Sequence, residues 1–265
     1  MPGPRPTRPR EAGPADLPLV EVETGAPVRA VFSTRLGGVS TGSFAALNLG
    51  SDGDDGDENV RANRRLLCEA LGVDPERVRM GRQVHGAGVR DRPRPQDAGR
   101  FTDELRGWAD GDGLVERRAG APLVVLGADC LPVLMWRRDG GGVAAAHAGW
   151  RGLVAGVLQA TVAALGAPAE TSVAIGPGVG PCCYEVSAEI RDEFEMRFGR
   201  QTVVGDAVHL AAAARAALCG AGVDPRWIQT LPTCTSCDDE RWFSYRRDGV
   251  SGRHAGIVWA TQGAA

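Results

Sequence analysis

The sequence contains no lysine, because all 30 of its Lys+Arg residues are arginine. Without lysine the protein cannot form a Schiff base with a carbonyl substrate. It also cannot contain a Walker P-loop, whose phosphate-binding lysine is obligatory. Any recognition of phosphate must therefore depend on arginine guanidinium groups, backbone N–H groups or a metal ion.

The chain also lacks an excess of positive charge and long apolar runs. The formal net charge is -3 and the pI is about 5.9, so the chain lacks the excess of cations with which proteins bind nucleic acid non-specifically. No apolar run approaches the roughly 18 residues of a membrane span. The N-terminus has no secretory apolar region, and the seven cysteines are odd in number, so we expect a reducing, cytoplasmic setting without structural disulfides.

The distribution of apolar residues predicts one folded domain over residues 28–265. Residues 1–27 are rich in proline and arginine, and we expect them to form a disordered extension. Residues 122–130, 131–136 and 141–147 predict three buried strands, and residues 241–260 predict a hairpin. Residues 150–166 predict one helix, and about 206–219 a second. Strands and helices do not alternate strictly, which favours an α/β or α+β layered sandwich with a mixed sheet over a doubly wound Rossmann fold.

Three reactive side chains lie at the ends of apolar runs. His85 and His147 are each followed closely by glycine, in "VHG" and "HAG", and Cys130 occupies the same kind of position. Glycine allows backbone or ligand to approach closely. The three residues could be zinc ligands with one coordination position left open, or Cys130 could be a nucleophile with His147 as its base. A buried thiol near an unrelated core imidazole is the structural alternative.

The other histidines and cysteines carry weaker signals. We expect structural or surface roles for His209 and His254. A lone CxxC pair, Cys234 and Cys237, is weak evidence for a metal or redox site. The neighbouring pair at 182–183 lies in a glycine-rich loop, where we expect packing residues rather than a redox switch.

Two arginines suit an anionic substrate. Arg35 in "STRLGGVS" and Arg151 in "HAGWRG" each lie beside glycines at the end of a predicted strand. A guanidinium in this setting can bind phosphate, although a surface or helix-capping role is equally compatible with the pattern.

Several motifs together resemble one known family. The chain is similar to the bacterial YfiH family, also known as the polyphenol-oxidase or laccase-domain family, from about Val28 to Trp259. The ordered motifs are "FSTRLGGVS", "LNLG", "QVHG", "ADGDGLV", "GADCLPVLM", "AAAHAGWRG", "AIGPGVGPCCYEV" and "FSYRRDG…GRHAGIVW". The resemblance implies a single-domain α/β fold of the YfiH-like type, shared with toxin deamidases that have a Cys-His pair.

The resemblance also implies a function. Family members are zinc-dependent purine nucleoside enzymes, which cleave adenosine, inosine and methylthioadenosine with phosphate to free base and pentose 1-phosphate, and deaminate adenosine. The family's zinc ligands correspond to His85, Cys130 and His147. The closing motif departs from the family in carrying two cysteines, which argues against a catalytic role for that pair.

Membership of the motifs suggests further substrate contacts. We expect Arg35 and Arg151 to bind phosphate with help from Ser33. Asn48 and Gln83 are candidates for contacts to the ribose or base. Asp129 is a candidate for proton transfer.

Other functions remain open at this stage. Some family members are described as peptidoglycan editing factors, which agrees with a Cys-His thiol hydrolase or amidase. A non-enzymatic protein that binds a partner and retains a vestigial metal pocket is the third alternative. Multicopper oxidase chemistry is excluded, because four histidines cannot supply both a blue-copper centre and a trinuclear cluster.

Overall fold

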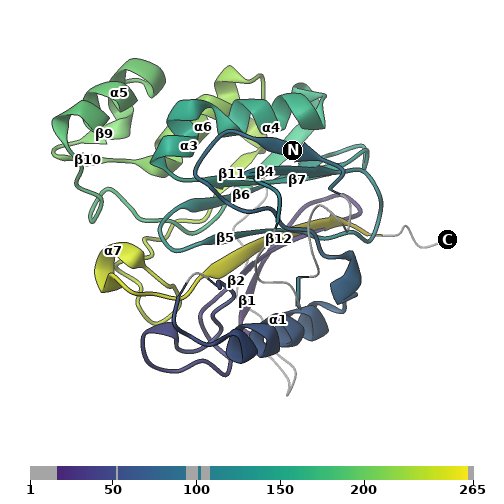
Figure 1. The fold of residues 1–265 in the computed structure, drawn as a ribbon. Coiled ribbons are helices and arrows are strands. Elements are labelled where there is room, and N and C mark those ends of the chain that lie inside the picture. The colour runs from purple at the N-terminus through teal and green to yellow at the C-terminus, as the bar shows by residue number, and fades with distance from the viewer. Residues whose placement is uncertain (1–16, 52, 94–100, 103–107, 262–265) are drawn as a thin grey trace.

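The protein is a sandwich of two β-sheets with helices on both outer faces (Figure 1). The computed structural model describes residues 17–51, 53–93, 101–102 and 108–261. One sheet has six strands in the order β11-β8-β6-β7-β4-β3, and the other has four in the order β1-β2-β12-β5. The predicted layered sandwich with a mixed sheet is therefore confirmed.

The four-stranded sheet is antiparallel throughout. Helix α1 covers its outer face (Figure 1), and the helix ends at Gly72 in a left-handed conformation that suits glycine. The elements of this half are β1 (Leu19–Val22), β2 (Val28–Ser33), β5 (Leu123–Gly127), β12 (His254–Ala260) and α1 (Asp57–Leu71).

The six-stranded sheet is mixed, with parallel pairs at its two edges and antiparallel pairs between them. Its strands are β3 (Val89–Asp91), β4 (Gly113–Glu116), β6 (Leu131–Arg137), β7 (Val143–Ala148), β8 (Thr171–Ile175) and β11 (Ile228–Thr230). Helices α3 (Trp150–Ala155), α4 (Val157–Leu165) and α6 (Leu210–Gly220) lie on its outer face (Figure 1).

A smaller group of elements lies beside these helices. It contains α5 (Ala188–Phe198) and the short hairpin of β9 (Val203–Val204) and β10 (Ala207–Val208). Helix α7 (Tyr245–Asp248) lies in the connection that leads to β12.

Burial of both sheet faces explains the continuous apolar runs of the sequence. In β6, Val133 and Met135 belong to the cluster beneath the helices, whereas Leu134 and Trp136 belong to the cluster between the two sheets. Successive side chains of a strand point to opposite faces, so a strand covered on both sides must be apolar at every position. The three predicted strands at 122–147 are confirmed as β5, β6 and β7.

Two predictions of helices need correction. The single helix predicted over 150–166 is broken at Gly156, which has a φ of 88° and separates α3 from α4. The alanine-rich helix begins only at Leu210, because Ala207–Val208 pair with β9 instead.

Predictions at the two ends of the chain also need correction. The expected hairpin at 241–260 is wrong. Its first half forms α7, and its apolar second half forms β12, which pairs with both β2 and β5. The disordered extension is wrong for Leu19–Val22, since these residues form β1 and pair with β2; residues 1–16 lie outside the described part. None of the described helices combines the length and apolarity needed to cross a bilayer.

The packing between the sheets can be tested by removing one side chain. Leu134 is fully buried between them, so Leu134→Ala should lower the free energy of unfolding by about 2–5 kcal/mol in urea titrations. Leu36 is 39% exposed, and Leu36→Ala should cost no more than about 1 kcal/mol. Equal losses in the two variants would contradict this description of the core.

Candidate active site

The structure brings His85, Cys130 and His147 together. One potential ligand atom of each lies within 4.8 Å of those of the other two. The two imidazole rings meet edge to face, with centroids 4.8 Å apart. The register of β6 and β7 explains part of this meeting, because His147 lies opposite Pro132, two residues after Cys130. The structural alternative of a thiol near an unrelated imidazole does not describe this arrangement.

Asp112 holds both histidines and was not identified from the sequence. Its Oδ1 accepts hydrogen bonds from His147 Nδ1 at 2.8 Å and from the backbone N–H of His85 at 3.0 Å. Its Oδ2 accepts from the N–H groups of Val84 and Gly86. Burial would raise the pKa of Asp112, but the hydrogen bonds from His147 and from these N–H groups outweigh it and lower the pKa. The carboxylate therefore stays ionised and accepts all four bonds.

These bonds set the geometry of both rings. With His147 Nδ1 donating to Asp112, Nε2 is left as the ligand atom, as in metal sites where a carboxylate orients histidine. His85 has a φ of 59°, a left-handed conformation that is costly for a residue other than glycine. The bonds from three successive N–H groups to Asp112 hold the chain in that conformation.

The sequence did contain a signal for Asp112. It lies in "ADGDGLV", immediately before β4, and β4 pairs with the strand that carries His147. The backbone N–H of His147 donates to the carbonyl of Asp112 at 2.8 Å. A carboxylate at the start of a strand beside a candidate histidine is thus a pattern that predicts such a supporting residue.

Gly149, two residues after His147, must be a glycine because the side chains of Cys130 and His85 lie close to its backbone. A Cβ atom at Gly149 would lie 2.7 Å from Cys130 Sγ and 3.3 Å from His85 Cδ2. Both distances are too short for an unstrained contact with Cys130 in place. The sequence "HAG" therefore leaves room for the thiol and the imidazole to meet.

The electrostatics of the site favour a thiolate. Burial alone would raise the pKa of Cys130, but the charges and hydrogen bonds of His147 and His85 outweigh it and lower the pKa to about 6. Burial alone would lower the pKa of His147, whereas Cys130 and Asp112 raise it to about 9. Without a metal, the two groups therefore form a thiolate–imidazolium pair near neutral pH.

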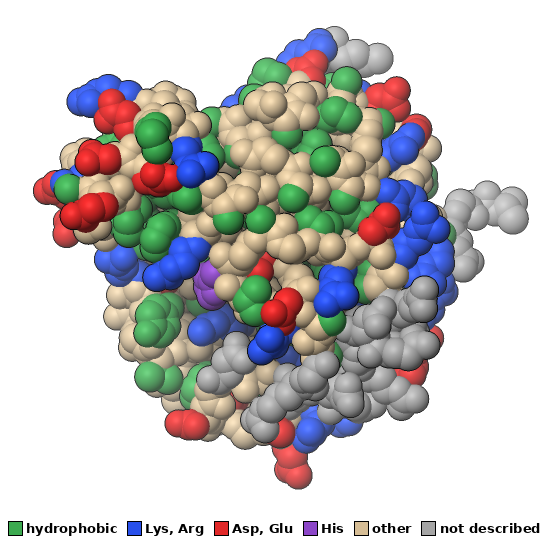
Figure 2. All heavy atoms as spheres, turned by 45° about the horizontal axis from the view of Figure 1, so that its top comes forward, with side chains coloured by type: hydrophobic (Ala, Val, Ile, Leu, Met, Phe, Trp, Pro, Cys, Tyr) green, Lys and Arg blue, Asp and Glu red, His purple; other side chains and the backbone are tan. Residues whose placement is uncertain are grey.

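The three side chains lie in the wall of a cavity of about 870 Å³. Figure 2 shows a histidine at the surface beside basic side chains. Four arginines and four aromatic residues also line the cavity: Arg82, Arg151, Arg246, Arg253, Trp108, Trp150, Tyr184 and Tyr245. The cavity thus combines positive charge with flat apolar surface, which suits a ligand that has both an anionic group and an aromatic ring.

Of the other predicted site residues, Gln83, Asp129 and Arg151 line this cavity. Arg151 packs over the ring of Trp150 at 4.5 Å. The amide of Gln83 is already paired, since it donates to the carbonyl and accepts from the N–H of Leu126.

Asp129 is also heavily hydrogen-bonded. Its carboxylate accepts from Thr235 Oγ1 at 2.6 Å, from Ser244 Oγ at 2.7 Å and from the backbone N–H of Arg246 at 2.6 Å. A carboxylate with these three donors ties two loops to the turn that carries Cys130.

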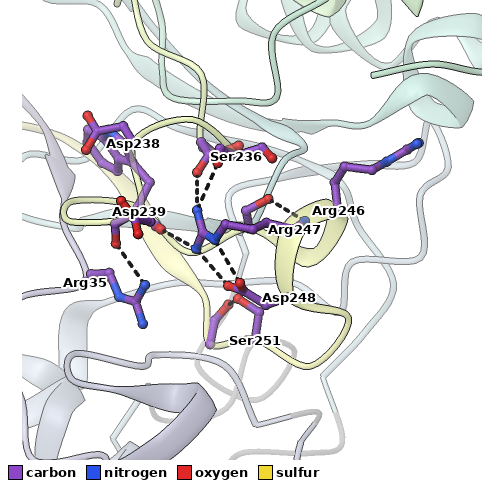
Figure 3. Close-up of polar contacts among 12 residues, drawn as sticks. Arg35, Ser236, Asp238, Asp239, Arg246, Arg247, Asp248 and Ser251 are labelled. Atoms are coloured by element: carbon purple, nitrogen blue, oxygen red, sulfur yellow. Dashed lines mark hydrogen bonds and ion pairs between the residues drawn. The ribbon is translucent and has the colours of Figure 1, made fainter. Parts of the chain in front are cut away.

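Ser33, Arg35 and Asn48 are not among the described residues that line the cavity. Ser33 Oγ accepts from the N–H of Ala255. Arg35 is directed to the carbonyl of Asp239 (Figure 3) and also donates to a second carbonyl. Asn48 Oδ1 accepts from the N–H of Arg253, so Asn48 contributes to the cavity only by positioning that residue.

The role of Asp112 can be tested through metal affinity. Asp112→Asn removes the charge that orients His147 and places an N–H₂ group among four donors. It should therefore weaken Zn²⁺ binding about 10–100-fold in chelator competition. Asp110→Asn, in the same motif but half exposed, should bind Zn²⁺ as the wild type does. Equal Zn²⁺ affinity in all three proteins would contradict the role of Asp112 in orienting His147.

The thiolate pair predicts a pH dependence in metal-free protein. Because the pKa of Cys130 is lowered to about 6, its alkylation by iodoacetamide should be fast above that pH and slow below it, as the thiolate becomes protonated. His147→Gln removes the main opposing charge and should move this midpoint upward. Peptide mass spectrometry separates Cys130 from the other cysteines. If the alkylation of Cys130 in the wild type had a pH midpoint near that of an ordinary thiol, the thiolate–imidazolium pair would be contradicted.

Known proteins are similar to this chain over almost all of its described residues. The profile of the family described as multi-copper polyphenol oxidoreductase laccase matches residues 29–261. A Pseudomonas aeruginosa protein named purine nucleoside phosphorylase is 40% identical over 241 residues, covering 88% of this chain and 93% of that protein. Escherichia coli YfiH, which has the same activity in its name, is 37% identical over 239 residues, with the same coverage.

Solved structures with a similar fold lead to the same family. The crystal structure of YlmD from Geobacillus stearothermophilus superimposes with a TM-score of 0.82 at 31% identity, covering 98% of this chain and 99% of that one. A Neisseria meningitidis protein gives 0.80 at 33% identity, covering 92% and 99%. The resemblance seen in the motifs is confirmed. The chain therefore belongs to the multi-copper polyphenol oxidoreductase laccase family, the family of YfiH and YlmD.

Proposed function

We propose that the protein is a zinc-dependent purine nucleoside phosphorylase. It cleaves adenosine, inosine and methylthioadenosine with phosphate to free base and pentose 1-phosphate, and it also deaminates adenosine. The observation that carries the proposal is the meeting of His85, Cys130 and His147 in the wall of a cavity lined by arginines and aromatic rings. The names of the relatives from P. aeruginosa and E. coli support the phosphorylase assignment.

The donor set fits a catalytic zinc ion. Two imidazoles and one thiolate would hold Zn²⁺ through His85, Cys130 and His147, whereas Mg²⁺ and Ca²⁺ prefer oxygen ligands. The carboxylate of Asp112 behind His147 is the support that such sites use. When bound by these residues, zinc would supply Lewis acidity toward phosphate, or toward water in deamination.

The arginines of the cavity provide the positive charge that would bind phosphate. Arg151 has no hydrogen-bond or ion-pair partner among the described residues, so its guanidinium is available to bind two phosphate oxygens. Arg246 and Arg253 line the same cavity and add positive charge. Since the sequence lacks lysine, these arginines are the cationic side chains that can hold phosphate against C1′ of the nucleoside.

The aromatic side chains of the cavity provide the surface that would hold the purine base. In phosphorolysis the C1′–N9 bond breaks as a phosphate oxygen attacks C1′, and the purine leaves from an oxocarbenium-like state. Trp150, Tyr184 and Tyr245 line the cavity, and a purine can stack on aromatic rings of this kind. Stacking fixes the position of the base relative to the phosphate, which lowers the entropic part of the barrier.

The remaining predicted residues support the site indirectly in this proposal. Asn48 positions Arg253, and Asp129 positions Arg246 through its backbone N–H. Ser33 and Arg35 stabilise neighbouring main chain. We therefore assign Asp129 to positioning rather than to proton transfer, because its carboxylate already accepts three hydrogen bonds.

Copper oxidation is not part of the proposal, although copper appears in the family's description. His209 caps the start of α6 through Nδ1, and His254 is fully buried against the ring of Trp242. With these two histidines committed elsewhere, the chain lacks the ligands for four copper ions.

We also propose that the protein acts in the reducing cytoplasm. All seven cysteines are free thiols in the structure, and both candidate ligand groups contain cysteine. Oxidation would remove these ligands, so a reducing compartment suits the site.

A thiol hydrolase is the second candidate function. The observation that favours it is the lowered pKa of Cys130 beside His147, which resembles the nucleophile and base of thiol hydrolases. In that function Cys130 would attack an amide carbonyl of a peptidoglycan precursor. Substitution of His85 distinguishes the two functions, since a Cys-His dyad does not require a second imidazole.

Incubation with adenosine, with and without phosphate, tests the proposal. Wild-type protein should release adenine and ribose 1-phosphate only when phosphate is present, together with some inosine from deamination. His85→Ala, Cys130→Ala and His147→Ala should each lose the zinc ion of this site and at least about 100-fold of the phosphorolysis rate. Chromatography of the products and metal analysis of the same samples are the measurements.

Cys219→Ala is the matched control, because this thiol lies in α6 outside the cavity lining. It should retain both zinc and activity. Loss of activity in Cys130→Ala and His147→Ala, but not in His85→Ala, would favour the thiol hydrolase. Normal zinc content with no release of base from any nucleoside would favour a partner-binding protein.

A further inference from the structure

The four cysteines of the "CC" and "CTSC" motifs meet at a second place. Cys182 and Cys183 lie in the turn after β8, and Cys234 and Cys237 lie in the turn after β11. One sulfur atom from each lies within 4.8 Å of the other three. The expectation that the first pair only packs is wrong for Cys182, which is exposed; Cys183 and Cys234 do contact the core.

We propose that these four cysteines bind a structural zinc ion as a tetrathiolate site. The Sγ of Cys237 lies 3.5 Å from that of Cys182 and 3.4 Å from that of Cys183. Four thiolates around Zn²⁺, at Zn–S distances of about 2.3 Å, are separated from one another by about 3.8 Å. A disulfide requires about 2.05 Å and joins only two sulfur atoms, so the arrangement of all four fits a metal better.

The backbone around Cys234 favours a thiolate at this position. The N–H of Gly180 donates to Cys234 Sγ at 3.2 Å, and a Cβ at this glycine would lie 3.2 Å from Cys182 Sγ. The N–H of Cys237 donates to the carbonyl of Cys234, which closes the turn between the two cysteines. Donation from N–H groups stabilises negative charge on sulfur, and the close turn directs both thiols to one point.

Arg247 holds the same turn from its other side. Its guanidinium donates to the carbonyls of Thr235 and Ser236, the two residues between the cysteines (Figure 3). The turn "CTSC" is therefore fixed on both sides. A metal ion would complete a site in which the turn is already held by the carbonyl contacts of Arg247.

The position of the site suggests what it stabilises. Cys183 directly precedes Tyr184, which lines the large cavity, and Thr235 donates to Asp129 beside Cys130. Zinc at this point would fasten the turn at 178–183, which leads to Tyr184, to the turn at 234–237, which contacts Asp129. This role is structural and does not depend on the proposed phosphorolysis.

The test is the zinc content of the full chain, purified anaerobically with a reductant. Wild-type protein should contain two zinc ions per chain. Cys182→Ser/Cys237→Ser should contain one, and so should Cys130→Ala. The double variant changes the two exposed cysteines, so its folding should not depend on lost core packing. Cys219→Ser, a partly buried thiol outside both groups, is the control and should retain two.

Cobalt substitution assigns the ions to their sites. Cys130→Ala protein reconstituted with Co²⁺ should show strong thiolate-to-cobalt absorption, which should disappear when Cys182→Ser/Cys237→Ser is added. Equal zinc content in the double variant and the wild type would overturn the proposal. So would Cys130→Ala protein that binds no cobalt, or wild-type protein in which the four thiols form disulfides and hold no second zinc. None of these readouts requires activity on nucleosides.

Discussion

The carboxylate of Asp112 is the group on which the candidate active site depends. It receives His147 Nδ1 and the N–H groups of three successive residues that include His85. The two histidines are 62 positions apart in the sequence and come from different elements, so neither alone determines where a metal ion would lie. A single buried anion fixes one imidazole by its ring and the other by its backbone. Its desolvation is offset by those four hydrogen bonds.

The two-sheet architecture brings these groups to one place. Pairing of β4 with β7 puts Asp112 beside His147, and pairing of β6 with β7 puts Cys130 near the same point. Because both faces of these strands are closely packed, a slip of register by one residue would exchange side chains of different size between two apolar clusters. Core packing therefore protects the geometry of the site.

The sequence was most informative where patterns were local. Apolar runs predicted β5 to β7, and the glycines that follow His85 and His147 indicated where a ligand could approach. It was least informative about long-range pairing. The partnership of β12 with β2 and β5, the four donors to Asp112 and the meeting of Cys182 with Cys237 all join residues that no local pattern relates. Arg35 has the same glycine-flanked setting as Arg151 but is directed to a carbonyl, because side-chain direction is decided by tertiary packing.

The proposed function requires that His85, Cys130 and His147 share one zinc ion. The most direct measurement is zinc X-ray absorption on the Cys182→Ser/Cys237→Ser protein, in which the second cysteine cluster no longer contributes to the signal. A zinc ion held by these three residues should give one sulfur at about 2.3 Å and two imidazole nitrogens at about 2.0–2.1 Å, with one lighter ligand completing the shell. A spectrum without sulfur, or protein with no bound zinc, would contradict it.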